Sequence, residues 1–139
     1  MRIDSFTNYS EFTIQISKKM VKILITGSTG KFGSSLMKSL PISNNITIAT
    51  RHIERETNNQ STNGYQYVYF NWAEPETFRD ALEGIDRVFL LQIGHLDQIH
   101  EFIDIAAEMN IQKIVYLSAP LPKLCGMKIP HHRVEEWIL

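Results

Sequence analysis

Residues 21–33 read VKILITGSTGKFG, and this stretch determines how the rest of the chain is interpreted. Five of its first six residues are apolar or β-branched, which is typical of a short buried parallel strand. Three glycines follow at a spacing of three, and a helical pattern begins at once with Phe32, Leu36 and Leu40 on one face. A strand, a glycine turn and a helix N-terminus together favour an anion site, because unpaired backbone N–H groups and the helix dipole converge there.

The three glycines fit the dinucleotide-binding pattern position by position. Gly27 permits the tight turn, Gly30 lets a pyrophosphate approach the backbone, and Gly33 lets the helix lie close to the strand. The alternative is an ordinary glycine-rich loop, since the pattern also occurs by chance. Framed by a strand and a helix, the loop predicts the following cofactor-binding residues: Gly27, Ser28, Thr29, Gly30, Lys31, Phe32 and Gly33.

Composition narrows the class of protein. The chain has 139 residues, enough for one domain with a single core, and 43% of them are hydrophobic. Its net charge of −1 gives no electrostatic reason to expect nucleic acid or an anionic membrane as a partner. The single cysteine, Cys125, excludes an internal disulfide and fits a reducing cytoplasm. No apolar run approaches the roughly 20 residues that a membrane span needs.

Residues 1–19 read as a mostly polar leader without the apolar centre of a secretory signal. We expect this segment to be disordered and the domain to occupy residues 20–139. The alternative is an extra edge strand, because Phe12, Ile14 and Ile16 alternate with polar residues.

Strand and helix patterns alternate after the glycine loop. Further strands are predicted at 46–50, 65–71, 87–92 and 113–118, and helices at 75–84, 96–110 and 131–139. Only a turn or two of helix is expected near Ile53, because a long polar run follows it.

This alternation predicts a Rossmann-type, doubly wound α/β fold with parallel strands in the order 3-2-1-4-5. The ligand crevice is expected between strands 1 and 4, where the order reverses. The chain stops before a sixth strand, so the terminal Trp137-Ile138-Leu139 is expected to leave an apolar helix face without a partner.

Residues 26–33 resemble the TGxxGxxG loop of the extended and atypical short-chain dehydrogenases. The match is closer to the NmrA-like branch and its NAD(P)H:quinone oxidoreductase-like members. Three later stretches support it: LEGIDRVFLL at 82–91, IQKIVYLSA at 111–119 and PHHRVEE at 130–136. The resemblance covers 20–139, but only about the N-terminal half of a family member; the substrate lobe of that family is absent.

Further residues are assigned to the cofactor. Arg51 ends the second predicted strand, where an arginine suits the 2′-phosphate of NADP, so NADP(H) is favoured over NAD(H). The alternative role of Arg51 is a surface ion pair with Glu54. Asn71 ends the third strand, where relatives often have an aspartate beside the adenine; it would otherwise cap the following helix. Gln92 and Ile93 end the fourth strand, where the backbone would line the ribose and nicotinamide.

The predicted catalytic residues are Ser118 and His131. Ser118 matches the active-site serine or threonine of the superfamily, although a strand-end hydroxyl also satisfies loop amides. The superfamily's YxxxK pair is missing, since Tyr116 has Pro120 four residues on. His131 stands near the lysine's place, as in quinone reductases of the NmrA-like branch, and could donate a proton near neutral pH. The alternative is a plain surface histidine at a helix terminus.

These features predict an NAD(P)H-binding domain whose parent activity is hydride transfer from NADPH to a quinone-like acceptor. Two alternatives stay open. One is a regulator that senses NADP(H) and acts through a partner protein, and the other is an inactive fragment without a complete active site. The oligomeric state does not follow from the sequence.

Overall fold

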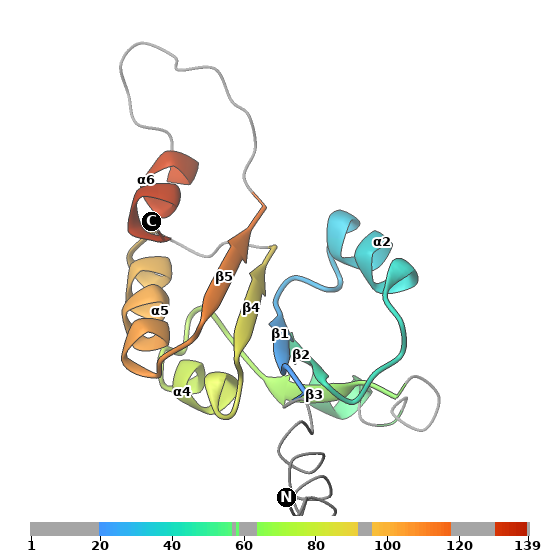
Figure 1. The fold of residues 1–139 in the computed structure, drawn as a ribbon. Coiled ribbons are helices and arrows are strands. Elements are labelled where there is room, and N and C mark those ends of the chain that lie inside the picture. The colour runs from blue at the N-terminus through green and yellow to red at the C-terminus, as the bar shows by residue number, and fades with distance from the viewer. Residues whose placement is uncertain (1–19, 57, 59–63, 92–95, 118–129, 139) are drawn as a thin grey trace, which may run out of the picture.

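The computed structural model describes residues 20–56, 58, 64–91, 96–117 and 130–138. They form a five-stranded, all-parallel sheet with the order β3-β2-β1-β4-β5 (Figure 1). The predicted doubly wound fold and its strand order are therefore confirmed. The expectations for the leader, residues 1–19, lie outside the described residues. The strands are β1 (Ile23–Ile25), β2 (Ile46–Thr50), β3 (Gln66–Tyr69), β4 (Arg87–Leu90) and β5 (Lys113–Tyr116).

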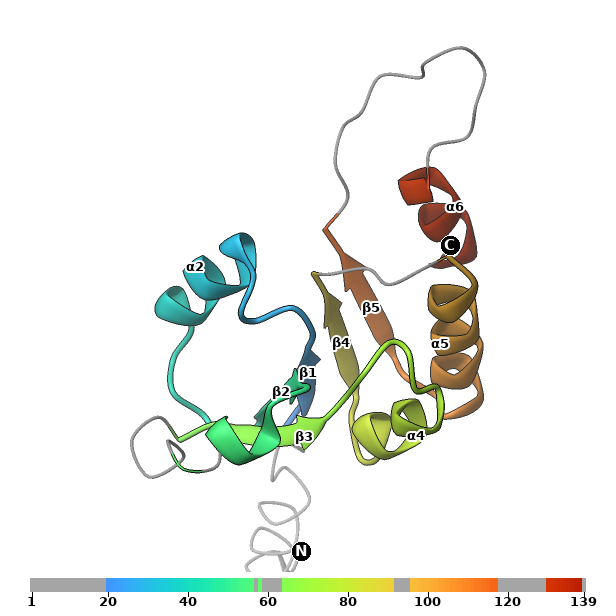
Figure 2. The same ribbon diagram turned by 180° about the vertical axis from the view of Figure 1, so that it is seen from behind.

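Helices cover both faces of the sheet. Of the described helices, α2 (Lys31–Ser39) lies on one face, and α4 (Glu76–Leu82), α5 (Leu96–Glu108) and α6 (Pro130–Ile138) lie on the other (Figures 1 and 2). Residues 53–56 add the short helical turn expected near Ile53. None of the helices within the described ranges is long and apolar enough to cross a bilayer.

The central strand is buried from both sides. Leu24 packs with the side chains of α4, α5 and α6, whereas its neighbour Ile25 packs with those of α2. Successive strand residues point to opposite faces, so a sheet covered by helices on both faces needs a continuous apolar run. This is why the run at 21–26 reads as apolar without alternation.

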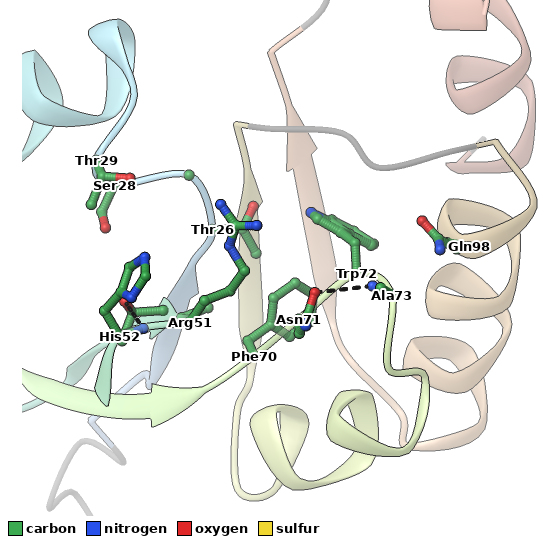
Figure 3. Close-up of a pocket in the computed structure, with 13 residues that line it drawn as sticks. Thr26, Ser28, Thr29, Arg51, His52, Phe70, Asn71, Trp72, Ala73 and Gln98 are labelled. Carbon is green, nitrogen blue, oxygen red and sulfur yellow. Dashed lines mark hydrogen bonds between the residues drawn. The ribbon is translucent and has the colours of Figure 1, made fainter. Parts of the chain in front are cut away.

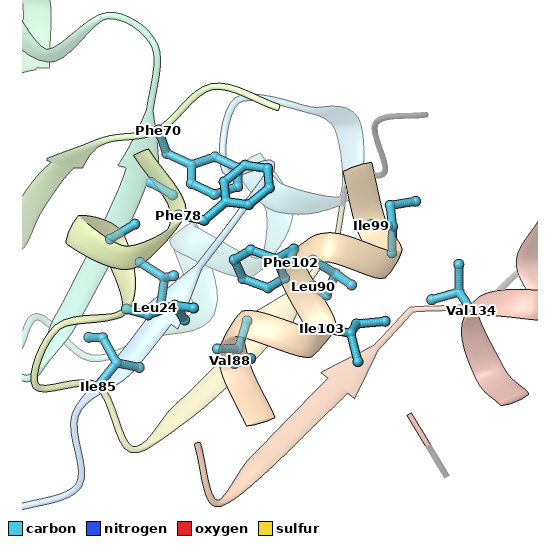
Figure 4. Close-up of a cluster of buried hydrophobic side chains, with 14 residues drawn as sticks. Leu24, Phe70, Phe78, Ile85, Val88, Leu90, Ile99, Phe102, Ile103 and Val134 are labelled. Atoms are coloured by element: carbon cyan, nitrogen blue, oxygen red, sulfur yellow. The ribbon is translucent and has the colours of Figure 1, made fainter. Parts of the chain in front are cut away.

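The larger core is mostly aliphatic, and it contains a cluster of phenylalanine rings (Figure 4). The rings of Phe70 and Phe78 stack at 5.3 Å, and Phe102 meets Phe78 edge-on at 5.4 Å. Trp72 approaches Phe70 edge-on at 4.9 Å. These rings fix the segment that follows β3, because offset and edge-to-face pairs have preferred geometries.

Asp86 ties three strands together at their amino ends. This buried carboxylate accepts a hydrogen bond from the Lys22 backbone N–H at 2.9 Å, and one from the Gln112 side chain at 3.4 Å. Its own backbone N–H donates to Lys22 O, and its carbonyl accepts from Gln112 N. The entries to β1, β4 and β5 are thereby held in register.

The apolar residues of α2 differ in their surroundings. Leu36 and Leu40 pack against the core beneath the helix, whereas Phe32, which shares their side of the helical pattern, is 69% exposed. The first turn of α2 projects beyond the strand ends, where no strand lies beneath it (Figure 1).

One expectation is wrong: Trp137 and Ile138, near the end of the chain, were expected to lack a partner. Both are partly buried against the core, because α6 packs along α5. The Trp137 ring lies 4.6 Å from the ring of His100, and Val134 is fully buried. Helix α6 is therefore an integral part of the larger core.

Candidate dinucleotide site

The end of β1 is hydrogen-bonded to the end of β4, at the point where the strand order reverses. Thr26 is 1% exposed, and its backbone N–H donates to Phe89 O at 3.1 Å. Its hydroxyl Oγ1 accepts a hydrogen bond from Leu91 N at 3.3 Å. This buried threonine holds the glycine loop directly above the crevice between the two strands.

The backbone of the loop requires glycine at two positions. Gly27 has a φ of 68°, a left-handed conformation that residues with a Cβ rarely adopt. A Cβ added to Gly33 would lie 2.0 Å from Gly27 O, so the helix lies against the loop with no room for a side chain. Gly30 N donates to Gly27 O at 3.1 Å and closes the turn.

The N-terminus of α2 has the properties of an anion site. Gly30 is the N-cap, and it supplies no side-chain hydrogen bond to the first amides. The first turn contains Lys31 and no acidic residue. Backbone N–H groups and the positive end of the helix dipole are thus presented together at the loop.

A cavity of about 440 Å³ lies beside this loop, over the carboxyl ends of β1, β2 and β3 (Figure 3). It is open to solvent on one side and is lined mainly by polar groups. The lining residues are Thr26, Gly27, Ser28, Thr29, Ala49, Thr50, Arg51, His52, Phe70, Asn71, Trp72, Ala73 and Gln98.

The structure brings together five of the predicted cofactor residues. Those that line the cavity are Gly27, Ser28, Thr29, Arg51 and Asn71. Gly30 and Gly33 shape the loop without lining the cavity, and Lys31 and Phe32 are exposed on the first turn of α2. Gln92, Ile93 and Ser118 lie outside the described residues. His131 belongs to the first turn of α6, but its side chain lies outside the described part of the structure.

The basic residues after β2 give the cavity its electrostatic character. Arg51 and His52 are both exposed, and no carboxylate is among the described residues that line the cavity. Figure 3 shows the Arg51 side chain extending toward Thr26 and the His52 ring turned toward Ser28 and Thr29. Positive charge without a competing carboxylate favours a ligand with several negative charges.

Asn71 organises a local turn, and it is not the N-cap of α4 that the sequence suggested as its alternative role. Its Nδ2 donates to Glu74 Oε1 at 2.7 Å, and its Oδ1 accepts from Ala73 N at 3.1 Å. The N-cap of α4 is Pro75, so Asn71 organises the turn before the helix rather than its first residue. One Nδ2 hydrogen is left over for a ligand, since an amide has two donors.

Several lining residues were missed by the sequence reasoning, notably His52, Trp72 and Gln98. His52 and Trp72 follow the ends of β2 and β3, so the rule that ligands bind at the carboxyl ends of parallel strands could have found them. Gln98 comes from α5 and carries no sequence signal, because only the packing of α5 against the sheet brings it to the cavity. Clusters of three or more potential metal ligands are absent from the residues that the structure describes.

A parallel doubly wound sheet, with a glycine loop and a helix N-terminus at its switch point and a basic cavity beside the loop, defines a nucleotide-binding Rossmann domain. The model of a family described as NAD(P)H-binding matches residues 27–128. The chain belongs to this NAD(P)H-binding family.

Individual relatives agree with this assignment. The chain is 30% identical over 131 residues to prestalk A differentiation protein A of Dictyostelium discoideum, covering 88% of this chain and 42% of that protein. The Citrobacter sp. triphenylmethane reductase complexed with NADP(H) superposes with a TM-score of 0.68 at 18% identity, covering 84% of this chain and 45% of that one. An NADPH-dependent quinone oxidoreductase of Escherichia coli superposes with a TM-score of 0.59 at 25% identity, covering 83% of this chain and 42% of that one.

These matches confirm the predicted resemblance to the short-chain dehydrogenase and quinone oxidoreductase group, and its restriction to part of a longer protein. The chain spans less than half the length of these relatives. It is an NAD(P)H-binding domain.

Proposed function

We propose that this domain binds NADPH in preference to NADH and belongs to an oxidoreductase that reduces a quinone-like acceptor. The observation that carries the cofactor preference is the cavity lining, which includes Arg51 and His52 but no carboxylate. NADPH differs from NADH by a 2′-phosphate, which an arginine recognises through paired hydrogen bonds. In NAD-specific sites of this fold, an acidic residue after the second strand binds the ribose hydroxyls instead.

The proposed arrangement assigns each part of the cofactor to a described part of the site. The pyrophosphate lies at the glycine loop, against the first amides of α2. The adenosine lies over the ends of β2 and β3, with Phe70, Trp72 and Asn71 on one side and Arg51 and His52 on the other. The nicotinamide then extends toward the ends of β4 and β5.

The quinone-like acceptor is supported by one solved relative, the NADPH-dependent quinone oxidoreductase of Escherichia coli. Bound NADPH supplies a hydride, and a quinone that takes up the hydride and one proton becomes a hydroquinone. The protein's part is to position the acceptor, exclude water and provide the proton. We assign the proton to His131, with Ser118 holding the acceptor oxygen, in line with the family resemblance.

A regulatory role is the second candidate. The catalytic YxxxK pattern does not follow β5, since Pro120 stands where the lysine would be. In addition, the name of the Dictyostelium relative refers to differentiation rather than to a reaction. In this alternative the domain binds NADP(H) and changes its affinity for a partner protein. Both candidates place the protein in the cytoplasm.

Calorimetric titration with NADPH and NADH tests the proposal. The informative variant is Gly30→Ala, whose Cβ would lie 3.3 Å from Gly27 O, so that this backbone oxygen has to shift by only a few tenths of an ångström. The added methyl group then occupies space that the pyrophosphate needs. We expect wild-type chain to bind NADPH more tightly than NADH, and Gly30→Ala to lose both while its circular dichroism stays the same. Retained NADPH affinity in this variant would refute the placement of the pyrophosphate.

A further inference from the structure

A second cavity, of about 460 Å³, lies between α4 and the amino-terminal parts of β2 and β3. It is at the opposite end of these two strands from the candidate dinucleotide site, and the proposed function does not use it. The described residues that line it are Lys22, Asn44, Asn45, Thr47, Gln66, Tyr67, Val68, Asp80, Ala81, Glu83 and Ile85.

The charged groups around this second cavity favour a further cation. Asp80 and Glu83 bring two carboxylates from the end of α4, whereas Lys22 brings one ammonium group. The Lys22 Nζ lies 4.0 Å from the position that a Cβ on Gly84 would take, which places it at the carbonyl end of α4, where a helix favours a cation. Neither Asp80 nor Glu83 forms a salt bridge with any residue that the structure describes. One negative charge is therefore left over at this cavity.

The first described residue of the chain lies at the rim of the second cavity. The side chain of Asn45, which lines the cavity, donates from Nδ2 to Met20 Sδ at 3.7 Å. Lys22, two residues after Met20, lines the cavity as well. The two residues directly before Met20 are Lys18 and Lys19. Because one extended residue spans only about 3.3–3.6 Å, chain geometry keeps both lysines within reach of the cavity.

We propose that the ammonium groups of Lys18 and Lys19 occupy the second cavity beside Asp80 and Glu83, so that the end of the leader connects the entry of β1 to α4. Their attachment to Met20 gives these lysines a high effective concentration at the cavity, which favours them over free cations. Ion pairs at an exposed site are individually weak and are screened by salt. Residues 1–17 take no part in this contact, and the dinucleotide site does not depend on it.

A thermodynamic cycle in the whole chain tests this contact. One variant combines Lys18→Gln with Lys19→Gln, a second combines Asp80→Asn with Glu83→Gln, and a third carries all four changes. At low salt we expect each of the first two to lower the Tm by about 2–6 °C, the effect of two exposed ion pairs, and the third to lower it by no more than either. In about 1 M sodium chloride these differences should largely disappear. Glu101→Gln is the matched control, since Glu101 is exposed on α5 outside the cavity, and it should leave the Tm unchanged.

The sign and the coupling decide the result of this cycle. The helix dipole by itself predicts that removing carboxylates near the carbonyl end of α4 raises the Tm, which is opposite to the loss expected here. Losses that add up in the third variant, or no loss in the first two, would overturn the contact.

Carbodiimide cross-linking, which joins an ammonium group to a neighbouring carboxylate as an amide, locates the partners directly. We expect peptide mass spectrometry to show Lys18 or Lys19 joined to Asp80 or Glu83 within one chain. Lys38, which lies on α2, is the control and should be joined to neither carboxylate. Cross-links between isotope-labelled and unlabelled chains would show that a second copy occupies the cavity. A Tm that spermidine raises equally in wild type and in the lysine variant would show a cavity open to free cations. Either outcome would overturn the leader as the occupant.

Discussion

Replacing Gly33 by alanine should destabilise the fold, although glycine-to-alanine changes inside helices usually stabilise. Gly33 is the third residue of α2 and is buried. An alanine Cβ there would lie 2.0 Å from Gly27 O and 2.7 Å from Ser28 Cα. Both are backbone atoms of the glycine loop, so neither can rotate out of the way.

The gain in helix propensity is smaller than the cost of relieving the steric contact. Alanine gains up to about 1 kcal/mol over glycine in helix propensity. Relieving the contact requires α2 to move away by about 1 Å or more, because non-bonded carbon atoms pack at roughly 3.5–4 Å. That movement withdraws Leu36 and Met37 from the cluster around Ile25 and Ile48. Overpacking of this kind typically costs about 1–3 kcal/mol, and here the clash is with rigid backbone, so we expect a net loss of about 1–2 kcal/mol.

Urea unfolding followed by circular dichroism measures this difference, with Ser35→Ala as the control. Ser35 is exposed on the same helix, and its replacement adds no new contact, so it should raise stability by a few tenths of a kcal/mol at most. The displaced loop of Gly33→Ala should also bind NADPH more weakly. A Gly33→Ala chain that is more stable than wild type and binds NADPH normally would refute the close contact between α2 and the loop.

Three further outcomes are expected. Arg51→Ala should weaken NADPH about ten- to a hundredfold more than NADH, since a hydrogen bond to a charged group contributes about 1.5–3 kcal/mol; equal losses in a calorimetric titration would count against a 2′-phosphate contact. Asp86→Ala should lower the free energy of unfolding in urea by about 2–4 kcal/mol, because the Lys22 N–H and the Gln112 side chain lose a buried acceptor, while NADPH affinity of the folded chain stays the same. The 139-residue chain alone should oxidise NADPH negligibly with a simple benzoquinone, since it spans less than half of its relatives, and fusion to a relative's C-terminal half should raise turnover. Substantial loss of NADPH absorbance with the short chain, abolished by Gly30→Ala, would show that the chain already holds a working site.

The local sequence was sufficient to predict the strands and helices and the order of the strands in the sheet. Apolar runs flanked by turns marked the five strands. Among the right-handed windings of a parallel sheet, the glycine loop after the first strand favoured the dinucleotide-binding order 3-2-1-4-5. The glycine loop was equally readable, since a positive φ at Gly27 and the lack of space at Gly33 both demand glycine. These features depend on residues near one another in the chain.

Only the tertiary structure decided which side chains share a surface. Phe32 and Trp137 have similar apolar character, yet Phe32 projects beyond the strand ends and Trp137 packs against His100 on α5. The cavity likewise combines His52 with Gln98 from a separate helix, a neighbourhood set by strand register and helix packing. Hydrophobic periodicity tells which face of an element is apolar, but a contact between distant segments depends on where each element ends and what lies across from it.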